Sequence, residues 1–395
     1  MKRRDFLRNT TFATGMFFVP QFLKAFEQNS IHTFSNKKVV IVQLKGGNDG
    51  LNTVVPYTND IYYQQRKNIA LEQNGLLKIS DEVGLHPSLH SLRNLYDKGY
   101  VSIINNVGYP NPNLSHFRST DIWQTASNSD EYLQNGWIGR YLDETKSQPY
   151  KAIEVDESLS LMLKGKLQNG LAITNPKLFY NSMREPFFNA IISNNDTHLS
   201  EHNLGYLYNT MIDAKSSAKH IFEKTKTTQE SNAYPNNIFG KQLKTIGQFI
   251  NSGLETQVYY AGLSGFDTHA NQLNSQERLL KLYAESMEAF VKDLNENNNF
   301  DDVIILTFSE FGRRVKQNES KGTDHGTANN VFVIGKNLKQ QGLYNNLPDL
   351  GDLDKNGNLK FEIDFREIYA TILDKWLEVD DARILNKSFS KLNFI

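Results

Sequence analysis

The chain has 395 residues, 39% of them hydrophobic and 22% charged, which suits one large α/β domain or two smaller ones. Its 43 basic and 44 acidic side chains leave a net charge of −1, so no electrostatic argument points to nucleic acid or an anionic membrane surface as a partner. Because there is no cysteine, disulfides, thiolate metal sites and cysteine nucleophiles are excluded.

The amino terminus has the pattern of an export signal. It reads KRRDFLR after the first Met, and a mostly apolar stretch follows from Phe12 to Phe26. Paired arginines before such a stretch are typical of the twin-arginine (Tat) route, although the basic start of an amphipathic helix is the other interpretation. Pro20 and Lys24 interrupt the stretch, so it predicts no stable membrane span. We expect residues 1–28 to be a signal segment and the protein to be periplasmic or extracellular.

The first buried strand is predicted at residues 38–44, an apolar run of strand length. Two glycines follow, which let the backbone turn sharply, and then come Asn48 and Asp49. Alone, this stretch also reads as a plain Asn-Asp-Gly turn without chemistry. Asp49, with Asn48 as the less favoured choice, is the first candidate metal ligand.

A second strand is predicted at residues 100–105, and a loop stiffened by two prolines leads from it to a helix that begins near Ser115. A serine at this place is most often an N-cap, because its oxygen accepts a backbone N–H of the first turn. The same place suits a nucleophile, since free N–H groups and the helix dipole stabilise negative charge. Arg118, one turn into the helix, is a candidate anion contact or a surface residue.

The rest of the chain alternates between strands and helices. Residues 157–240 are the least regular part, where we expect helical insertions or a cap. A strand is predicted at 256–261, an amphipathic helix at 276–294 and a strand at 303–307. This order predicts one α/β domain over residues 38–395, with a doubly wound, mostly parallel sheet sandwiched by helices.

Polar side chains gather at the ends of these later strands. The further candidate metal ligands are Asp267, His269, Glu310, Asp324 and His325. In open α/β sheets, ligands bind at the edge where the strands end, so these groups and Ser115 are expected to meet there. Asp and His together suit Zn²⁺, Mn²⁺ or Fe better than Ca²⁺ or Mg²⁺. Such an ion would lower the pKa of a serine hydroxyl or of a bound water.

Several motifs resemble one large bacterial family. GGNDGLNTVVPY, LSHFRSTDIWQT, GFDTHANQ, SEFGR and DHGTANN occur in order over most of the chain after the signal. They are similar to the family known as domain of unknown function 1501 (DUF1501), in which a twin-arginine signal is common. More remotely, that family resembles the alkaline phosphatase-like superfamily, which includes sulfatases. The resemblance implies a doubly wound sheet, Asp and His metal ligands at strand ends, and a nucleophile at a helix start.

Carried over residue by residue, the resemblance places Asp49 as the carboxylate after the first strand. Ser115 falls at the nucleophile position, with Ser119 as a rival. Asp267 and His269 resemble the Asp-His pair of one metal site.

The same comparison also shows a departure from the superfamily pattern. His325, with Asp324 beside it, resembles the late His ligand, and Glu310 stands in place of an Asp. Phe311 stands where the superfamily has a His, so one ligand is missing. The resemblance therefore leaves open one metal ion, two or none.

Two functions follow from these expectations. The first is an exported, metal-dependent hydrolase of phosphate or sulfate esters, with zinc or manganese as the ion and glycan or polymeric esters among its substrates. The second is an exported binding or assembly protein with a protein partner, which keeps the fold without turnover. Glu310 and the other polar groups favour the first function, and Phe311 favours the second.

Overall fold

The computed structural model describes residues 36–395, except 187, 189, 191–202, 229–230 and 232. The predicted signal segment, residues 1–28, lies outside the described residues. The chain divides after Asn36, and the unit from Lys37 to Ile395 carries the fold described below.

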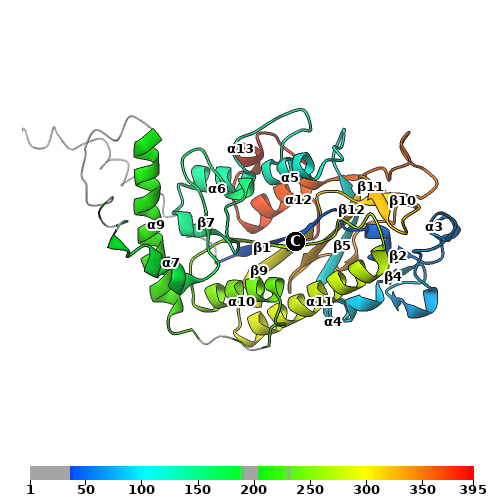
Figure 1. Cartoon of the computed structure of the whole chain (residues 1–395), viewed down its shortest axis with the longest axis horizontal. Helices are drawn as coiled ribbons and strands as arrows, with labels where there is room; N and C mark the ends of the chain where they lie inside the picture. Colours follow the sequence, from blue (N-terminus) through cyan, green and yellow to red (C-terminus); the bar gives the residue numbers. More distant parts are fainter. Residues whose placement is uncertain (1–35, 187, 189, 191–202, 229–230, 232) are drawn as a thin grey trace, which may run out of the picture. The chain divides into compact units, whose positions relative to one another are not determined.

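A nine-stranded sheet forms the centre of this unit (Figure 1). Its order is β13-β5-β12-β9-β1-β8-β6-β7, and β14 also pairs with β5. The strands are β1 (Lys38–Lys45), β5 (Val101–Gly108), β6 (Ala152–Glu154), β7 (Leu171–Ala172), β8 (Val258–Ser264), β9 (Val303–Phe308), β12 (Asn329–Ile334), β13 (Gly342–Leu343) and β14 (Ile363–Asp364).

The strand directions bring the ends of most strands to one edge. β9, β1, β8, β6 and β7 are parallel to one another, whereas β12 runs antiparallel to both β9 and β5. The start of β12 therefore lies at the edge where β5, β9, β1 and β8 end. The predicted doubly wound, mostly parallel sheet is confirmed, and the one antiparallel strand carries its preceding segment to the same edge.

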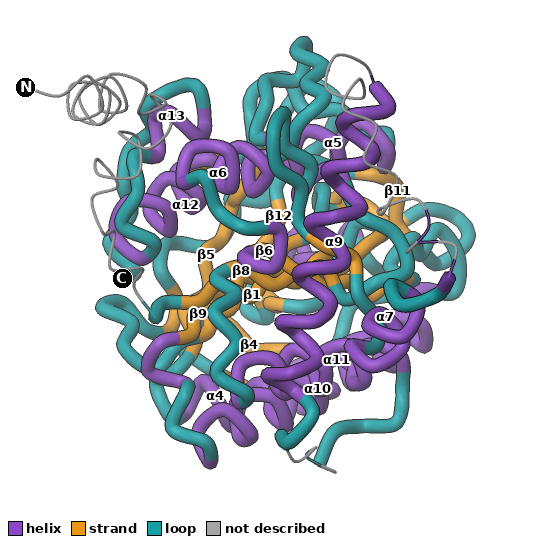
Figure 2. Tube along the Cα trace, turned by 90° about the vertical axis from the view of Figure 1, so that its left-hand side faces the viewer, coloured by secondary structure: helices purple, strands orange, loops and turns teal. Residues whose placement is uncertain are grey.

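Helices cover both faces of the sheet (Figures 1 and 2). One face packs against α4 (His90–Asp97), α10 (Ile238–Asn251) and α11 (Gln272–Glu296). The other face packs against α5 (His116–Thr125), α6 (Trp137–Thr145), α12 (Phe365–Thr371) and α13 (Asp381–Leu385). Alternate side chains of a strand point to opposite faces, so β1 sends Val40 and Val42 into the first core and Val39 and Ile41 into the second.

Two small sheets stand beside the main one. The first is formed by β2 (Val54–Pro56), β4 (Val83–Leu85) and β3 (Leu77–Lys78), next to α3 (Asp60–Gln65). The second is the hairpin of β10 (Arg313–Gln317) and β11 (Thr323–His325). This hairpin lies between Glu310 and β12, and it pairs Arg313 with His325 across its two strands.

Short helical turns link the main elements. They are η1 (Gly50–Asn52), η2 (Gln73–Gly75), η3 (Pro87–Leu89), η4 (Pro149–Lys151), η5 (Leu161–Leu163), η7 (Phe300–Asp302) and the π-helix η8 (Ile372–Trp376). His86 caps η3 by accepting the N–H of Ser88 on its Nδ1.

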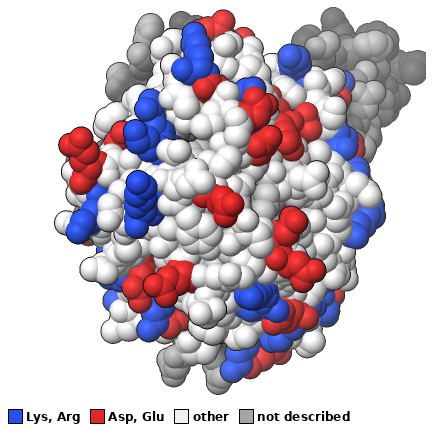
Figure 3. Space-filling model, turned by 90° about the vertical axis from the view of Figure 1, so that its right-hand side faces the viewer, with Lys and Arg blue, Asp and Glu red and all other residues white. Residues whose placement is uncertain are grey.

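The segment 157–240 contains α7 (Pro176–Ser182), α9 (Asn203–Thr225) and the start of α10, and it also supplies β7 to the sheet edge. Among the described residues, no helix is both long and apolar enough to cross a membrane. On the face drawn in Figure 3, basic and acidic side chains are interspersed.

Candidate metal centre

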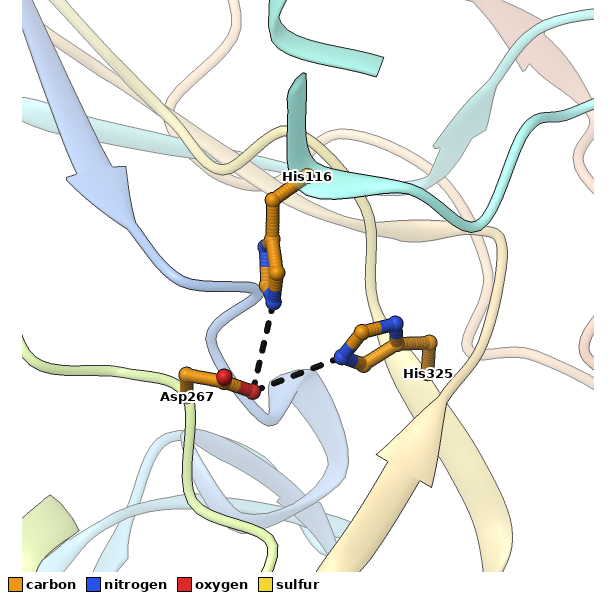
Figure 4. A group of neighbouring side chains, drawn as sticks. All are labelled: His116, Asp267 and His325. Atoms are coloured by element: carbon orange, nitrogen blue, oxygen red, sulfur yellow. Dashed lines mark hydrogen bonds and ion pairs between the residues drawn. The ribbon is translucent and has the colours of Figure 1, made fainter. Parts of the chain in front are cut away.

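The carboxylate of Asp267 lies among three imidazole rings. Its Oδ1 is 3.2 Å from Nε2 of His116, 3.1 Å from Nε2 of His269 and 3.4 Å from Nε2 of His325. The Nε2 atoms of His269 and His325 are 2.9 Å apart. Figure 4 shows His116 and His325 pointing at Asp267 from two sides. One carboxylate and three ring nitrogens thus converge, and three of these groups (His116, Asp267 and His325) offer ligand atoms within 4.8 Å of one another.

These side chains come from distant parts of the sequence that share the sheet edge. His116 is the first residue of α5, which follows β5, and Asp267 lies in the loop after β8. His325 ends β11, which directly precedes β12. Gly46, at the end of β1, has φ +118°, and a Cβ there would lie 2.5 Å from the amide nitrogen of Asp267. The glycine turn therefore lets β1 approach the loop that carries the carboxylate.

The Nδ1 atom of each ring faces an oxygen acceptor. The pairs are His116 with Oε1 of Glu310 at 2.8 Å, His325 with the carbonyl of Leu114 at 2.7 Å, and His269 with Oδ1 of Asp324 at 3.5 Å. An oxygen acceptor within hydrogen-bond distance requires a proton on Nδ1, so the neutral rings of His116 and His325 have a lone pair on Nε2. The Nδ1 of His269 makes only the longer contact with Asp324, and its Nε2 is placed to donate to the Nε2 of His325. Two lone pairs, a third ring nitrogen and a carboxylate thus face one another, which resembles metal ligands held by acceptors behind them.

Two further observations fit a cation at this point. The Nε2 atom of His116 is shielded from solvent and makes no hydrogen bond within the described part of the chain, although Asp267 is near. A buried nitrogen without a partner is costly unless an ion or water satisfies it. The side chain of Asp267 is 49% exposed, so a ligand reaches the group from solvent.

The electrostatics keep the central carboxylate charged. Partial burial of Asp267 favours its neutral form, but the hydrogen bond and positive charge of Arg313 outweigh this and lower its pKa to about 2. Arg313 donates to Oδ1 at 2.8 Å, and its own side chain is fully buried. The bond to Glu310 raises the pKa of His116, whereas burial lowers the pKa of His325.

The carboxylates of Glu310 and Asp324 lie on the Nδ1 side of the imidazole rings, away from the converging Nε2 atoms. Glu310 is 2% exposed, and its Oε1 accepts the N–H of Gly46 at 2.8 Å as well as contacting His116. Asp324 faces the Nδ1 of His269. In this position the two carboxylates orient imidazoles.

Asp49 and Asn48 are engaged elsewhere. The carboxylate of Asp49 is buried in an ion pair with Arg66, 2.5 Å away, and also accepts from Gln272. Asn48 bonds Thr53 through its side chain. Neither residue belongs to the group around Asp267.

The residues of α5 have separate roles. The guanidinium of Arg118 donates to the carbonyls of residues 128, 129 and 131 and stacks on Tyr132, so it fixes a loop. The hydroxyl of Ser119 is buried and bonds Tyr109 and the carbonyl of Glu310. Ser115 is exposed, and although it is the N-cap residue, its side chain makes no capping hydrogen bond.

His116 is the site residue that sequence reasoning missed. The serine of LSHFRST was the predicted site residue, because a serine at a helix start is commonly an N-cap or a nucleophile. The available signal was the imidazole beside it, placed at the first helical position after a strand that ends at the ligand-binding edge.

Phe311 also lies in this group. Its ring centroid is 4.7 Å from those of both His116 and His325. The side chain that stands where the resemblance implies a His therefore packs against the imidazoles and offers no ligand atom.

Three solved structures are similar to this chain at low sequence identity. The lipoteichoic acid synthase LtaP from Listeria monocytogenes is 11% identical, with 90% of this chain and 77% of that one covered and a TM-score of 0.43. The PsFucS1 sulfatase from Pseudoalteromonas sp. is 13% identical, with 90% and 70% covered and a TM-score of 0.40. The periplasmic domain of EcEptC from Escherichia coli, in complex with Zn, is 11% identical, with 76% and 72% covered and a TM-score of 0.38.

A search among curated proteins found no sequence that matches the chain. The model of a family described as protein of unknown function (DUF1501) matches residues 36–389, nearly all of the unit that carries the fold. This match confirms the resemblance seen in the motifs, and the chain belongs to the DUF1501 family.

Proposed function

We propose that this protein is an exported, metal-dependent hydrolase of phosphate or sulfate esters. The observation that carries the proposal is the convergence of three Nε2 atoms on the carboxylate of Asp267, at an edge open to solvent. Three imidazoles and one carboxylate form a donor set that suits zinc or manganese. When bound, such an ion would polarise an ester oxygen and lower the pKa of a hydroxyl or water beside it.

Ser115 is the proposed nucleophile. Its neighbours on both sides belong to the site, because the carbonyl of Leu114 bonds His325 and the ring of His116 faces Asp267. Its hydroxyl is exposed and makes no capping bond, so it is available to react. Attack on the phosphorus or sulfur would form a covalent ester on Oγ and release the alcohol, and water would then hydrolyse that ester.

The start of α5 supports the same role. Since no side chain caps it, the N–H groups of its first turn are free to meet the oxygens of an anionic ester, and the helix dipole adds to this attraction. Ser119 is less suited to attack, because its buried hydroxyl is already bonded.

An assay with metal supplied tests the function. The protein is purified after expression with zinc or manganese and assayed on a panel of phosphate and sulfate esters that includes nitrophenyl, glycan and polymeric esters. Activity that falls in Asp267→Asn in parallel with metal content supports the proposal. A wild type that holds stoichiometric metal and turns over none of the esters contradicts it.

Phe311 favours a second candidate function, an exported binding or assembly protein without turnover. The phenylalanine fills space beside His116 and His325 without offering a ligand atom. Metal bound at the site together with no hydrolysis of any ester is the result that this function predicts.

A further inference from the structure

The carboxylate of Glu310, which lies behind His116, has hydrogen-bond partners on both oxygens. Its Oε1 accepts the N–H of Gly46 at 2.8 Å and faces Nδ1 of His116 at 2.8 Å, while its Oε2 accepts Nε2–H of Gln43 at 3.3 Å. Glu310 and Gln43 are 2% and 1% exposed, so water does not compete for these bonds. The direction in which Gln43 presents its amide therefore decides whether Glu310 meets a donor or an acceptor.

A tyrosine fixes that direction. Tyr260 is fully buried on β8, and its hydroxyl donates to Oε1 of Gln43 at 2.5 Å. The same hydroxyl accepts from Nε2 of Gln124 at 3.4 Å, so its single proton goes to Gln43. The other N–H of Gln43 reaches the hydroxyl of Thr120 at 3.4 Å. Every hydrogen-bonding atom of the Gln43 amide is thus engaged, with its NH₂ end toward Glu310.

We propose that Gln43 and Tyr260 are positioning residues of the metal centre, which hold Glu310 as an acceptor and through it fix the ring direction and tautomer of His116. The inference rests on the proposed metal-dependent function, because the tautomer matters for leaving Nε2 free to bind the ion. Neither residue is itself within the group of ligands around Asp267.

The physical reason is that an amide side chain has a donor on one side and an acceptor on the other, in groups of nearly the same shape. Without the hydroxyl of Tyr260, the Oε1 of Gln43 has no donor, and rotation of the amide by half a turn would place that oxygen against Glu310. Two acceptors in contact repel, so the carboxylate would shift. That shift removes the acceptor that holds the proton on Nδ1 of His116, and the neutral ring can then carry its proton on Nε2 instead.

The test uses Tyr260→Phe and Gln43→Met in the full chain, with Tyr259→Phe as the matched control. Tyr259 is the preceding residue of the same strand, equally buried, but its side chain belongs to the opposite core. Zinc affinity is measured by competition with a chromogenic chelator. We expect a loss of about 10- to 100-fold in both test variants, as is typical when support behind a ligand is removed, and no more than about twofold in the control.

A second readout is independent of metal. In chelator-treated protein labelled with ¹⁵N-histidine, long-range ¹H–¹⁵N spectra distinguish a ring protonated on Nδ1 from one protonated on Nε2. We expect the Nδ1–H form of His116 in the wild type and in Tyr259→Phe, and a mixed or Nε2–H form in Tyr260→Phe and Gln43→Met. Two test variants keep the experiment decisive if one of them does not fold.

The outcomes separate this inference from the proposed function. Wild-type zinc affinity and an unchanged His116 tautomer in both folded test variants would overturn the inference while leaving the metal centre in place. A wild type that binds neither zinc nor manganese but shows the expected tautomer shift in the variants would uphold the positioning of His116 and overturn the metal-dependent function.

Discussion

At the scale of single residues, His116 is the best-supported new ligand candidate. The Nε2 of this residue is shielded from solvent, lacks a hydrogen bond and faces Asp267, while Glu310 holds the opposite ring nitrogen. The imidazole is thereby aligned, and in its neutral form the lone pair lies on the atom that faces the other candidate ligands.

We expect His116→Ala to lower the metal content of the purified protein, because the change removes a neutral imidazole donor whose direction is already fixed. Elemental analysis after expression with zinc supplied measures the effect, and His269→Ala and His325→Ala should behave alike. His90→Ala is the control, since His90 is an exposed residue of α4. Equal metal content in the wild type and His116→Ala would remove this residue from the ligand set.

Ser115 gives a prediction that separates chemistry from stability. Replacing an N-cap side chain that makes its bond costs about 1 kcal/mol, and Ser115 makes none, so Ser115→Ala should lower the melting temperature by no more than a few degrees. If Ser115 is the nucleophile, ester hydrolysis should fall by several orders of magnitude. Full activity in Ser115→Ala would transfer the role to Ser119 or to a water molecule.

At the scale of elements, the buried carboxyl of Glu154 at the end of β6 should make stability depend on pH. Burial raises its pKa to about 7 from an ordinary value of 4.5, against the lowering effect of the N–H of Ser160, which donates to Oε2 at 2.6 Å. The folded protein therefore binds this proton more tightly than the unfolded chain does. The contribution of Glu154 to stability is therefore largest below about pH 4.5 and is lost as the pH rises through about 7.

Glu154→Gln should remove this pH dependence, since an amide keeps an acceptor for Ser160 and carries no charge. Urea unfolding at pH 5 and pH 8 measures it. Between these two conditions the wild type should lose up to about 3 kcal/mol of unfolding free energy relative to the variant. Parallel pH profiles for the two proteins would show that Glu154 is not buried as described.

Much of the element order could be predicted because buried strands and amphipathic helices leave simple patterns. The apolar run at 303–307 became β9, and the periodic segment at 276–294 became the longer α11. The hairpin of β10 and β11 was not predicted, because its strands are polar. The guanidinium of Arg313 is buried because backbone carbonyls and Asp267 accept its hydrogen bonds. Such contacts join residues far apart in sequence and leave no local pattern.

The candidate site was predictable to a similar degree. Asp267, His269 and His325 follow from the rule that ligands gather where strands end. The partner of Asp49 could not be predicted in the same way, because Arg66 lies 17 residues further along the chain, outside any predicted strand. Nor does spacing alone distinguish a carboxylate that faces an ion from one, such as Glu310, that faces the back of an imidazole.

At the scale of the whole molecule, the fold brings the candidate ligands together at one edge of the sheet. Four segments reach that edge: the ends of β1, β8 and β9, and the start of α5 after β5. Because β12 is antiparallel, the hairpin that precedes it and carries His325 lies at the same edge. A site assembled from so many segments forms only after folding, which fits a route that exports folded proteins.

The export proposal rests on the amino-terminal arginines, and it can be tested in the intact chain. We expect Arg3→Lys with Arg4→Lys to abolish export, because lysine keeps the charge but loses the planar guanidinium that distinguishes paired arginines from other basic pairs. Cell fractionation measures the share of protein outside the cytoplasm. Arg8→Lys is the matched control, since it makes the same exchange in the same basic region outside the pair. Periplasmic or surface accumulation of the double variant at the wild-type level would contradict the Tat route, whereas its retention in the cytoplasm with metal bound would show that the centre assembles before export.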